Sequence, residues 1–374
     1  MIDIGLVREN PELIKENIKK KFQDEKIKKV DELIKKDIKY RKSLQESEKL
    51  RAERNKITSE INELKKQGKD IKKLIKQAKE IPIKIKEIEE TQNKLKKEIK
   101  EILYIIPNII HKSVPIGKND KDNVVIETIG KPKEFKFKVK SHVEIAEKLN
   151  IADFETSAKT SGKGFYFLKG KLGLLNMALI NFARDFMTKN GYLYIEPPLM
   201  IRENILKGVY SREEIEEISY KIQDEDLYLI ATSEHPLIGM FINKTIRKED
   251  LPIRITGFSP CFRKEIGSHG IDEKGLFRTH QFFKQEMIVI CEPEDSYRFY
   301  DEMNNLAKAM FKKLKIPFRE RECCSADLAD LKAKSSDLEA YSPRKNEYFE
   351  ITSLTNMESA QARRLNIKIG RAHV

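Results

Sequence analysis

The chain has 374 residues, of which 36% are charged and 39% belong to the hydrophobic set, and its net charge is +13. This length predicts two domains with a sizeable core. No apolar run approaches the roughly 18 residues that a membrane-spanning helix needs. The amino-terminal residues lack the basic-then-apolar pattern of a signal peptide. We therefore expect a cytoplasmic protein that does not associate with membranes.

The cysteines do not form a recognisable framework. There are only four in a chain of this size, Cys261, Cys291, Cys323 and Cys324. A disulfide scaffold would need more of them, and the adjacent pair lacks the CxxC spacing of a zinc site. We expect small packing residues and no zinc.

Positive charge is concentrated in the first quarter of the chain. Residues 1–100 contain 30 lysines and arginines against 20 acids, so ten of the thirteen net charges lie there. Between Lys65 and Lys79 there are seven lysines and a single acid, Asp70. Such an excess favours a polyanionic partner such as a phosphate backbone. A lysine- and isoleucine-rich composition can also reflect an AT-rich genome.

The apolar residues between Ile71 and Ile106 recur at spacings of three and four, and only Gln92 interrupts them. This pattern predicts a coiled-coil helix of about 50 Å, with a kink at Pro82. The segment from Asp24 to Lys66 is also predicted to be helical. Gly68 and Asp70 suit a tight reversal and a helix cap, so the two helices form an antiparallel two-helix arm.

Six lysines gather where the two predicted helices meet. They are Lys65, Lys66, Lys69, Lys72, Lys73 and Lys76. A solvated charged surface is the usual position of lysine on a coiled coil, and a nucleic-acid contact is the alternative. From the residues alone, both interpretations stand.

Periodicity breaks at residues 107–120, which we expect to link the arm to a second domain. This domain is predicted to be α+β, with helices flanking an antiparallel sheet. Its expected strands are 164–168, 192–198, 227–231, 253–258 and 348–353, and its clearest helices are 171–189 and 295–314. No GxGxxG or Walker A loop occurs, which argues against a Rossmann or P-loop nucleotide site.

The most informative segment is Phe262-Arg263-Lys264-Glu265, followed by Arg278 to Glu286. It reads as two strands joined by a mobile, glycine-bearing loop from Ile266 to Phe277. Strict alternation places Arg263 and Glu265 on one strand face. An arginine buried there needs an anion, and a guanidinium suits phosphate oxygens. A half-exposed hairpin with ordinary salt bridges is the alternative.

These two segments resemble motif 2 of the class II aminoacyl-tRNA synthetases. Upstream, Ala231-Thr232-Ser233-Glu234-His235-Pro236 resembles the Thr-x-Glu loop of the seryl-tRNA synthetase family, and Leu50 to Asn55 is similar to that family's first arm helix. The likeness runs from the first helix to about residue 368. It implies a class II catalytic domain (121–368) behind an amino-terminal tRNA-binding domain (1–106).

The resemblance also implies roles for individual residues. Arg263 would clamp the α-phosphate of ATP and Glu265 would orient the nucleotide, while Glu286 would accept the hydroxyl of the substrate serine. The serine site would consist of Thr232, Ser233, Glu234 and Glu286. The ATP site would consist of Arg263, Lys264, Glu265, Thr279, His280, Gln281, Phe282, Glu350, Ile351, Thr352 and Ser353. Mg²⁺ on the phosphates would be held by Glu350 and Ser353, because a carboxylate suits that hard cation.

The implied reaction is the activation of L-serine with ATP, followed by transfer of the seryl group to tRNA(Ser). The arm, with its six lysines, would then grip the tRNA by shape and phosphate contact. The unit formed by residues 171–198 resembles motif 1, which implies a homodimer. Two alternatives remain at this stage: a related ligase that acylates another acceptor, and a non-catalytic RNA-binding coiled-coil protein.

Some stretches depart from the family pattern. The family has a glycine-bearing stretch at 325–330 and a tryptophan where Tyr341 stands, and the segment from Tyr220 to Leu237 is closer to archaeal and eukaryotic members. Motif 3 does not follow residue 368. We hypothesise that residues 369–374 are a non-native tail, since a common sequencing-adapter read encodes them, and we expect the chain as written to be nearly inactive.

Overall fold

A computed structural model describes residues 1–210, 212–265 and 275–370. It divides into two compact units: residues 2–107, and residues 108 onward together with Met1. The first unit is entirely helical. The second contains the sheets, with helices between them.

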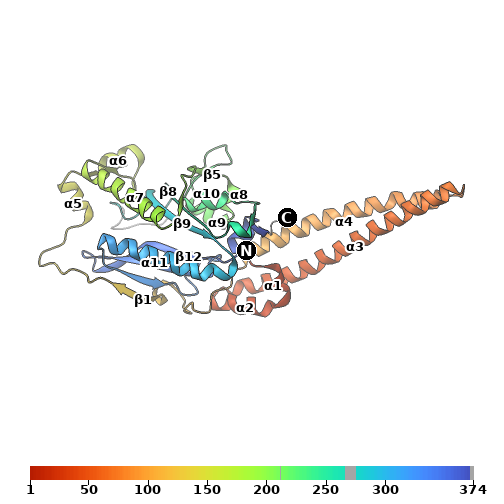
Figure 1. The fold of residues 1–374 in the computed structure, drawn as a ribbon, viewed down its shortest axis with the longest axis horizontal. Coiled ribbons are helices and arrows are strands. Elements are labelled where there is room, and N and C mark those ends of the chain that lie inside the picture. The colour runs from red at the N-terminus through yellow and green to blue at the C-terminus, as the bar shows by residue number, and fades with distance from the viewer. Residues whose placement is uncertain (211, 266–274, 371–374) are drawn as a thin grey trace. The chain divides into compact units, whose positions relative to one another are not determined.

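The first unit is built on a long helical hairpin, as expected (Figure 1). Its elements are α1 (Ile4–Glu9), α2 (Pro11–Lys20), α3 (Ile27–Lys66) and α4 (Lys72–Ile105). The turn uses Gly68 at a φ of +69°, a conformation that glycine adopts without strain. The backbone N–H of Lys72 donates to Asp70 Oδ1 at 2.9 Å. Helix α4 continues through Pro82 without interruption.

The predicted seam holds the two arm helices together. Ile57 of α3 is buried with Ile81 and Ile85 of α4. The one polar seam residue is also accommodated, because the Gln92 side-chain amide donates to Ser43 O at 2.9 Å and to Ser47 Oγ at 3.1 Å. A buried amide with both contacts satisfied keeps the two helices in one register.

The second unit contains two main sheets. One has the order β1-β10-β11-β12 and is entirely antiparallel. The other has the order β4-β8-β9, in which β8 and β9 form an antiparallel pair of ten residues each. The strands of these sheets are β1 (Val124–Ile129), β4 (Leu193–Tyr194), β8 (Ile253–Phe262), β9 (Gln281–Ile290), β10 (Phe318–Glu322), β11 (Lys334–Ser342) and β12 (Glu347–Asn356).

Shorter strands pair outside these sheets. They are β2 (Ala152–Asp153) with β3 (Phe167–Leu168), β5 (Met200–Ile201) with β6 (Tyr228–Leu229), and β7 (Thr245–Arg247) with β13 (Lys368–Gly370). Residues 369 and 370 of the expected tail thus lie in β13. Residues 371–374 and most of the expected loop, 266–274, are outside the described residues.

Helices cover the sheets. The helices of this unit are α5 (His142–Lys148), α6 (Phe154–Ser161), α7 (Lys171–Lys189), α8 (Glu203–Leu206), α9 (Arg212–Ile218), α10 (Glu234–Gly239), α11 (Ser296–Leu314) and α12 (Ala360–Arg364). Helix α11 lies along the four-stranded sheet (Figure 1). There Ala307 is buried against Phe318 and Leu338. The predicted helix 171–189 is confirmed to the residue, and α11 begins one residue later than expected.

Three expected strands are much shorter than predicted. Residues 164–168, 192–198 and 227–231 form strands of only two residues each, β3, β4 and β6. Each pairs with its partner over only two positions, and Pro197 and Pro198 cannot donate to a ladder. The prediction from alternation was wrong there, because alternation does not show how many residues of a neighbouring strand are available for pairing.

The start of the second unit is hydrogen-bonded to its body. Asn108 N donates to Asp330 O at 2.6 Å, and His111 N donates to Ala333 O at 2.8 Å. The segment from residue 108 to 117, which we expected to be part of a linker, is therefore packed. No helix among the described residues has the length and apolar character needed to cross a lipid bilayer.

Candidate active site

The floor of the candidate site is one face of strand β9. Side chains alternate along a strand, so Phe282, Lys284 and Glu286 point to the same side. On β8, their partners are Cys261, Ser259 and Gly257. An aromatic ring, a cation and a carboxylate therefore follow one another along about 14 Å of strand.

The loop before α10 closes over the carboxylate end of this row. Thr232 Oγ1 donates to Glu286 Oε1, although the two residues are 54 positions apart in sequence. The backbone N–H of Glu234 in turn donates to Thr232 Oγ1 at 3.2 Å. The expected serine-binding residues Thr232, Glu234 and Glu286 are thus brought together.

Ser233 differs from its two neighbours. It is completely buried, and its hydroxyl donates to the carbonyl of Gly257 at 3.0 Å. Contact between this hydroxyl and a substrate would require Ser233 to leave that bond. Its visible role is to attach the loop to β8.

Gly257 is required for this close approach. A Cβ atom at that position would lie 2.7 Å from Leu237 Cδ1 of α10 and 2.8 Å from the carbonyl oxygen of Ile195. Both distances are far below van der Waals contact. Any side chain here would push α10, and with it Thr232 and Glu234, away from Glu286.

Arg263 lies at the opposite end of the row. Strand β8 ends at Phe262, and the Arg263 Nε donates to the carbonyl of Ala231 at 3.3 Å, next to Thr232. Its guanidinium carbon lies 5.2 Å from the ring centre of Phe282. One anchored arginine thus faces an aromatic ring, an arrangement that can hold the phosphate and base of a nucleotide.

The expected strand does not continue to Glu265, and this prediction was wrong. Glu265 has a φ of +46°, which ends the strict alternation on which a shared face with Arg263 was inferred. Its carboxylate instead lies 3.3 Å from the NH1 of Arg278, so the two residues link the two ends of the loop.

The remaining nucleotide-site residues stand at the base of the hairpin. Lys264 Nζ donates to Glu216 O at 2.8 Å, and Thr279 Oγ1 donates to Gln281 O at 2.8 Å. The His280 Nδ1 lies 3.0 Å from both the Tyr220 hydroxyl and the Arg263 carbonyl. These contacts hold the backbone on either side of Arg263.

The electrostatics of the row centre on Lys284 and Glu286. Lys284 Nζ lies 2.8 Å from Glu286 Oε1, and their side chains are 36% and 15% exposed. Burial opposes the charge on Lys284, but the charge and hydrogen bond of Glu286 outweigh it and raise the lysine pKa above its usual value. Lys284 is therefore protonated at neutral pH.

A second acidic group faces the row from β12. The surrounding protein, and after it the Asp337 carboxylate, raise the pKa of Glu350, although its side chain remains open to solvent. Burial likewise raises the pKa of Asp337, which pairs with Ser353 across β11 and β12. The environment of the two carboxylates disfavours their negative charge. Together with the Ser353 hydroxyl, they therefore suit a divalent cation such as Mg²⁺.

No metal-binding group of three or more His, Cys, Asp or Glu residues occurs within residues 1–210, 212–265 and 275–370. Glu350, Asp337 and the Ser353 hydroxyl form a smaller oxygen set, which fits a cation that is also coordinated by its substrate. Ile351 and Thr352 follow Glu350 on β12, where a register irregularity separates Glu350 from Thr352.

His235 lies directly behind the serine loop. It is completely buried, neither ring nitrogen has a hydrogen-bond partner among the residues that the structure describes, and its ring meets Tyr210 edge-on at 4.9 Å. Burial lowers the pKa of His235 to about 3. The ring is thus neutral, so it adds bulk but no charge beside Lys284 and Arg263.

The structure adds residues that the sequence analysis did not assign. Lys284 could have been found, since it stands two positions from both Phe282 and Glu286 on one strand. Asp337 and Gln361 carry no local signal. The Gln361 amide donates to Glu234 Oε1 at 3.0 Å across 127 positions, which only the fold brings together.

The six arm lysines are all exposed at the turn between α3 and α4. Lys65 and Lys66 end α3, Lys69 lies in the turn, and Lys72, Lys73 and Lys76 lie in the first turns of α4. The structure therefore places them at one end of the arm as a single basic patch.

Comparisons with known proteins agree with this arrangement. Residues 1–110 match the protein family described as "Seryl-tRNA synthetase N-terminal domain". Residues 218–373 match the family described as "tRNA synthetase class II core domain (G, H, P, S and T)". A serine--tRNA ligase of Methanospirillum hungatei is 46% identical over 75% of this chain and 66% of its own length. One from Thermoplasma acidophilum is 41% identical over 75% and 69%.

Solved structures are similar as well. Seryl-tRNA synthetase from Pyrococcus horikoshii, complexed with ATP, has a TM-score of 0.94 and 41% identity over 99% of this chain and 88% of that one. The cytoplasmic serine–tRNA ligase of Naegleria fowleri, in complex with AMP, has a TM-score of 0.89 and 32% identity over the same shares. The chain spans about two thirds of the length of the curated relatives it matches.

Proposed function

The chain belongs to the seryl-tRNA synthetase family of class II aminoacyl-tRNA synthetases, and on this basis we propose that it activates L-serine with ATP and esterifies tRNA(Ser). The observation that carries the proposal is the contact of Thr232 with Glu286 beside an anchored Arg263. A related ligase for another acceptor and a non-catalytic coiled-coil protein are not favoured, because the curated relatives are named serine--tRNA ligases and a seryl-tRNA synthetase structure matches 99% of this chain.

The first step forms seryl-adenylate. The serine carboxylate attacks the α-phosphorus of ATP, and pyrophosphate leaves with its electron pair. Arg263 stabilises the charge that develops on the α-phosphate, and its stacked neighbour Phe282 receives the adenine. No covalent protein nucleophile is required, because positioning and charge neutralisation lower the barrier.

Selection of serine rests on Glu286. Its carboxylate accepts the serine hydroxyl, and Lys284 Nζ holds that carboxylate at 2.8 Å. Alanine would fill the same space without donating the hydroxyl hydrogen bond to this carboxylate, and the loss of a hydrogen bond to a charged group discriminates better than a missing methylene. Thr232 and Glu234 bind the amino group, and Gln361 holds the Glu234 carboxylate in place.

In the second step, the terminal ribose hydroxyl of the tRNA attacks the activated carbonyl and AMP leaves. Glu350 and Ser353, with Asp337 beside them, would hold Mg²⁺, which neutralises phosphate charge when bound. The exposed lysines of the arm turn bind tRNA phosphates.

We also propose a homodimer formed through α7. The helix exposes a row of apolar side chains: Leu174 is 71% exposed, Leu175 54% and Met177 52%. The nearby Leu193 of β4 is 65% exposed. Monomers rarely leave such a face uncovered. Leu174→Asp should convert a dimer to a monomer in analytical ultracentrifugation, whereas the exposed Leu149→Asp should not.

The function is tested by ATP–pyrophosphate exchange with serine, alanine, threonine or cysteine. The assay should use both this chain and the full-length product of its gene. Exchange that depends on serine alone supports the proposal. Glu286→Gln should lower exchange by about 10²-fold while leaving tRNA binding by the arm intact. Equal exchange with alanine in the unmodified protein would refute the assignment of Glu286.

A further inference from the structure

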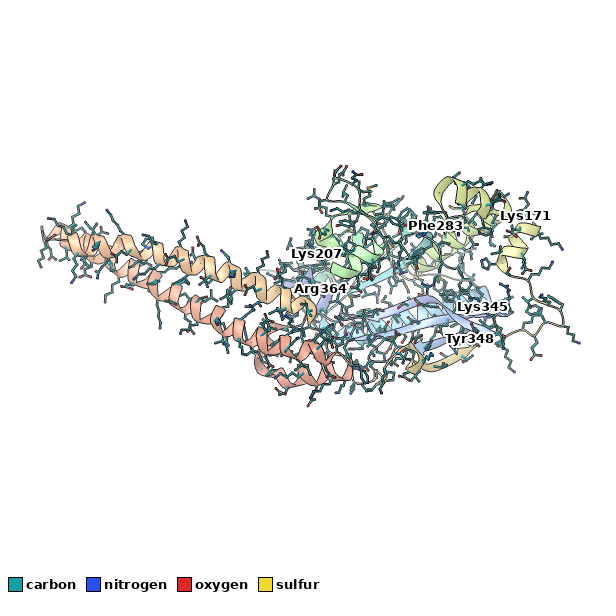
Figure 2. The ribbon with its side chains drawn as sticks, turned by 180° about the vertical axis from the view of Figure 1, so that it is seen from behind. Lys171, Lys207, Phe283, Lys345, Tyr348 and Arg364 are labelled. Carbon is teal, nitrogen blue, oxygen red and sulfur yellow. The ribbon has the colours of Figure 1, made fainter. Side chains whose placement is uncertain are left out.

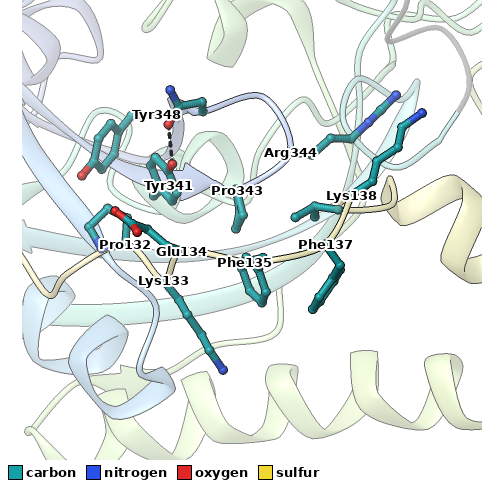
Figure 3. A pocket seen from close by; sticks show the side chains of 12 residues that line it. Pro132, Lys133, Glu134, Phe135, Phe137, Lys138, Tyr341, Pro343, Arg344 and Tyr348 are labelled. Carbon is teal, nitrogen blue, oxygen red and sulfur yellow. Dashed lines mark hydrogen bonds between the residues drawn. The ribbon is translucent and has the colours of Figure 1, made fainter.

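A cleft of about 920 Å³ lies beside the candidate active site and has no role in the chemistry described above. One wall is the extended segment 132–139, which precedes α5. The other wall is the turn between β11 and β12, with Tyr341, Pro343, Arg344 and Tyr348 (Figure 3). All of its lining residues belong to the second unit. Figure 2 shows the position of this turn in the whole molecule, where Lys345 and Tyr348 are labelled.

The cleft is basic. Residues 131–140 contain five lysines and a single acid, Glu134, and the opposite wall adds Arg344. Lys138 and Arg344 extend toward the same side (Figure 3). Both lie near Glu144, but that carboxylate already accepts the Ser141 N–H and caps α5. No ion pair engages Lys138 or Arg344 in the described part of the chain. The cleft therefore attracts an anion.

The cleft is also aromatic. Phe137 is 69% exposed and Phe135 is 37% exposed, and their rings meet edge-on at 5.3 Å. Lys133 Nζ lies 5.5 Å from the ring centre of Phe135. Exposed phenylalanines alternating with lysines are costly as a bare surface, because each ring leaves apolar area in water. Interleaved aromatic and basic residues are the means by which proteins hold single-stranded nucleic acid.

The elements that line the cleft also lead to the candidate active site. Tyr348 stands two positions before Glu350 on β12, about 7 Å along the strand. The base of the loop between β8 and β9 contacts residues that are next to the lining residues in sequence or that follow the cleft segment. Its Leu276 N–H donates to His142 Nε2 at 3.0 Å, and its Phe277 ring lies 4.5 Å from Phe349 and 4.9 Å from Lys345 Nζ.

We propose that this cleft binds the unpaired 3′ nucleotides of the tRNA as they approach the seryl-adenylate. Phe137 and Phe135 stack on bases, and Lys138 and Arg344 contact the phosphates between them. The proposal rests on the proposed function, since it assigns a path to the same tRNA. It adds an RNA contact in the catalytic unit that is separate from the basic patch of the arm.

An RNA strand fits these walls better than a mononucleotide does. The cleft is open, and one of its walls is an irregular segment. On the other wall, the Arg319 guanidinium already covers one face of the Tyr348 ring, 4.5 Å from the ring centre. A single nucleotide would gain one stacking contact here. A strand gains successive stacking and phosphate contacts, and it is delivered by the rest of the tRNA.

The test combines two protein variants with two RNAs. The variants are Phe137→Ala and the double variant Lys138→Ala/Arg344→Ala. The matched controls are Leu149→Ala, which removes another exposed apolar side chain, and Lys313→Ala, which removes another exposed charge. The RNAs are tRNA(Ser) and the same tRNA without its unpaired 3′ nucleotides.

We expect Phe137→Ala to weaken binding of intact tRNA about tenfold and to leave binding of the shortened tRNA unchanged. The double variant should do the same and should flatten the salt dependence for intact tRNA only. A fluorescent base analogue at the 3′ terminus should be quenched on binding, and Phe137→Ala should abolish the quenching whereas Phe137→Tyr restores it. The controls should behave as the unmodified protein.

Serine-dependent pyrophosphate exchange needs no tRNA and separates the two hypotheses. Unchanged exchange together with the 3′-dependent loss supports the cleft. A loss that is equal for intact and shortened tRNA, or an absence of loss for both, overturns the cleft while leaving the proposed function in place. Absence of exchange in the unmodified full-length protein overturns the proposed function, and the binding comparison still decides whether the cleft contacts RNA.

Discussion

The arm and the candidate active site use charge in opposite ways. On the arm, six lysines are exposed at the end of α3, in the turn and at the start of α4, within a stretch of twelve positions. In the site, Lys284, Glu286 and Arg263 are partly buried and are held by residues from distant parts of the chain. Exposed charges are screened and nearly interchangeable, whereas buried ones act at one position. Substitutions should therefore have graded effects on the arm and abrupt effects in the site.

The largest effect is expected at Arg263. Arg263→Ala removes the guanidinium that we propose to face the α-phosphate, and serine-dependent pyrophosphate exchange should fall about 10³-fold. Arg202→Ala, on an exposed position of the same unit, should change exchange less than twofold. Thermal unfolding should be similar in both variants. If Arg263→Lys retains most of the exchange activity, a point charge is sufficient and the planar guanidinium is not required.

The arm should respond in proportion to the number of charges removed. Changing Lys69, Lys72 and Lys73 at the turn to glutamine should weaken tRNA binding about tenfold at moderate salt and reduce its salt dependence. The matched change of Lys94, Lys96 and Lys97 on the shaft of α4 should have a much smaller effect. Filter binding at several salt concentrations measures both. Equal losses from the two triplets would mean that general charge, and not the turn, attracts the RNA.

His235 should make the second unit sensitive to acid. Burial lowers its pKa from 6.5 to about 3, so the folded state resists a proton that the unfolded state accepts. Its contribution to stability is complete above pH 6.5 and is lost as the pH falls toward 3. Between pH 7.5 and 5.5 this costs about 1.4 kcal/mol.

The measurement is the free energy of unfolding by urea at both pH values. His235→Gln cannot titrate, so its stability should fall by about 1.4 kcal/mol less over this interval. An identical pH dependence in the variant and the unmodified protein would mean that the ring can be protonated in place.

The smallest effect is expected in the arm seam. Gln92→Leu replaces an amide bonded to Ser43 and Ser47 by an apolar side chain that suits the seam. The arm should gain up to about 1 kcal/mol, since apolar residues stabilise such a seam, but its register should be less well determined. Thermal unfolding followed by circular dichroism measures the stability of the arm. Cysteine cross-linking between α3 and α4 measures their register. A destabilised arm would show that the amide contacts outweigh apolar packing.

The two regions were also predictable to different degrees. The arm follows from spacing alone: Ile81 and Ile85 are buried as the repeat requires, and Gly68 adopts the conformation that its turn demands. In the second unit, α7 and α11 followed from periodicity, but the strands around Phe167 and Tyr228 are shorter than their alternation indicated. A helix bonds within itself, whereas the length of a strand is decided by its partner.

The roles proposed for individual site residues came from resemblance, and the structure supplies the contacts among them. Lys284 stands in the recognised segment and could have been inferred from its two-residue spacing to Glu286. The deviation at Glu265 could not, because a positive φ in a non-glycine residue leaves no pattern in the sequence.

By itself, the sequence determined the helical arm, its basic turn, the α+β character of the second unit and the residues that resemble a serine-activating site. These features depend on local spacing and on residue type. Only the tertiary structure decided that Thr232 reaches Glu286, that Gln361 holds Glu234, that His235 is sealed without a partner, and that Phe137 and Arg344 face a common cleft. Such contacts join residues tens to hundreds of positions apart, and the chain reveals them only when packing of the sheets and helices brings distant segments within hydrogen-bond range.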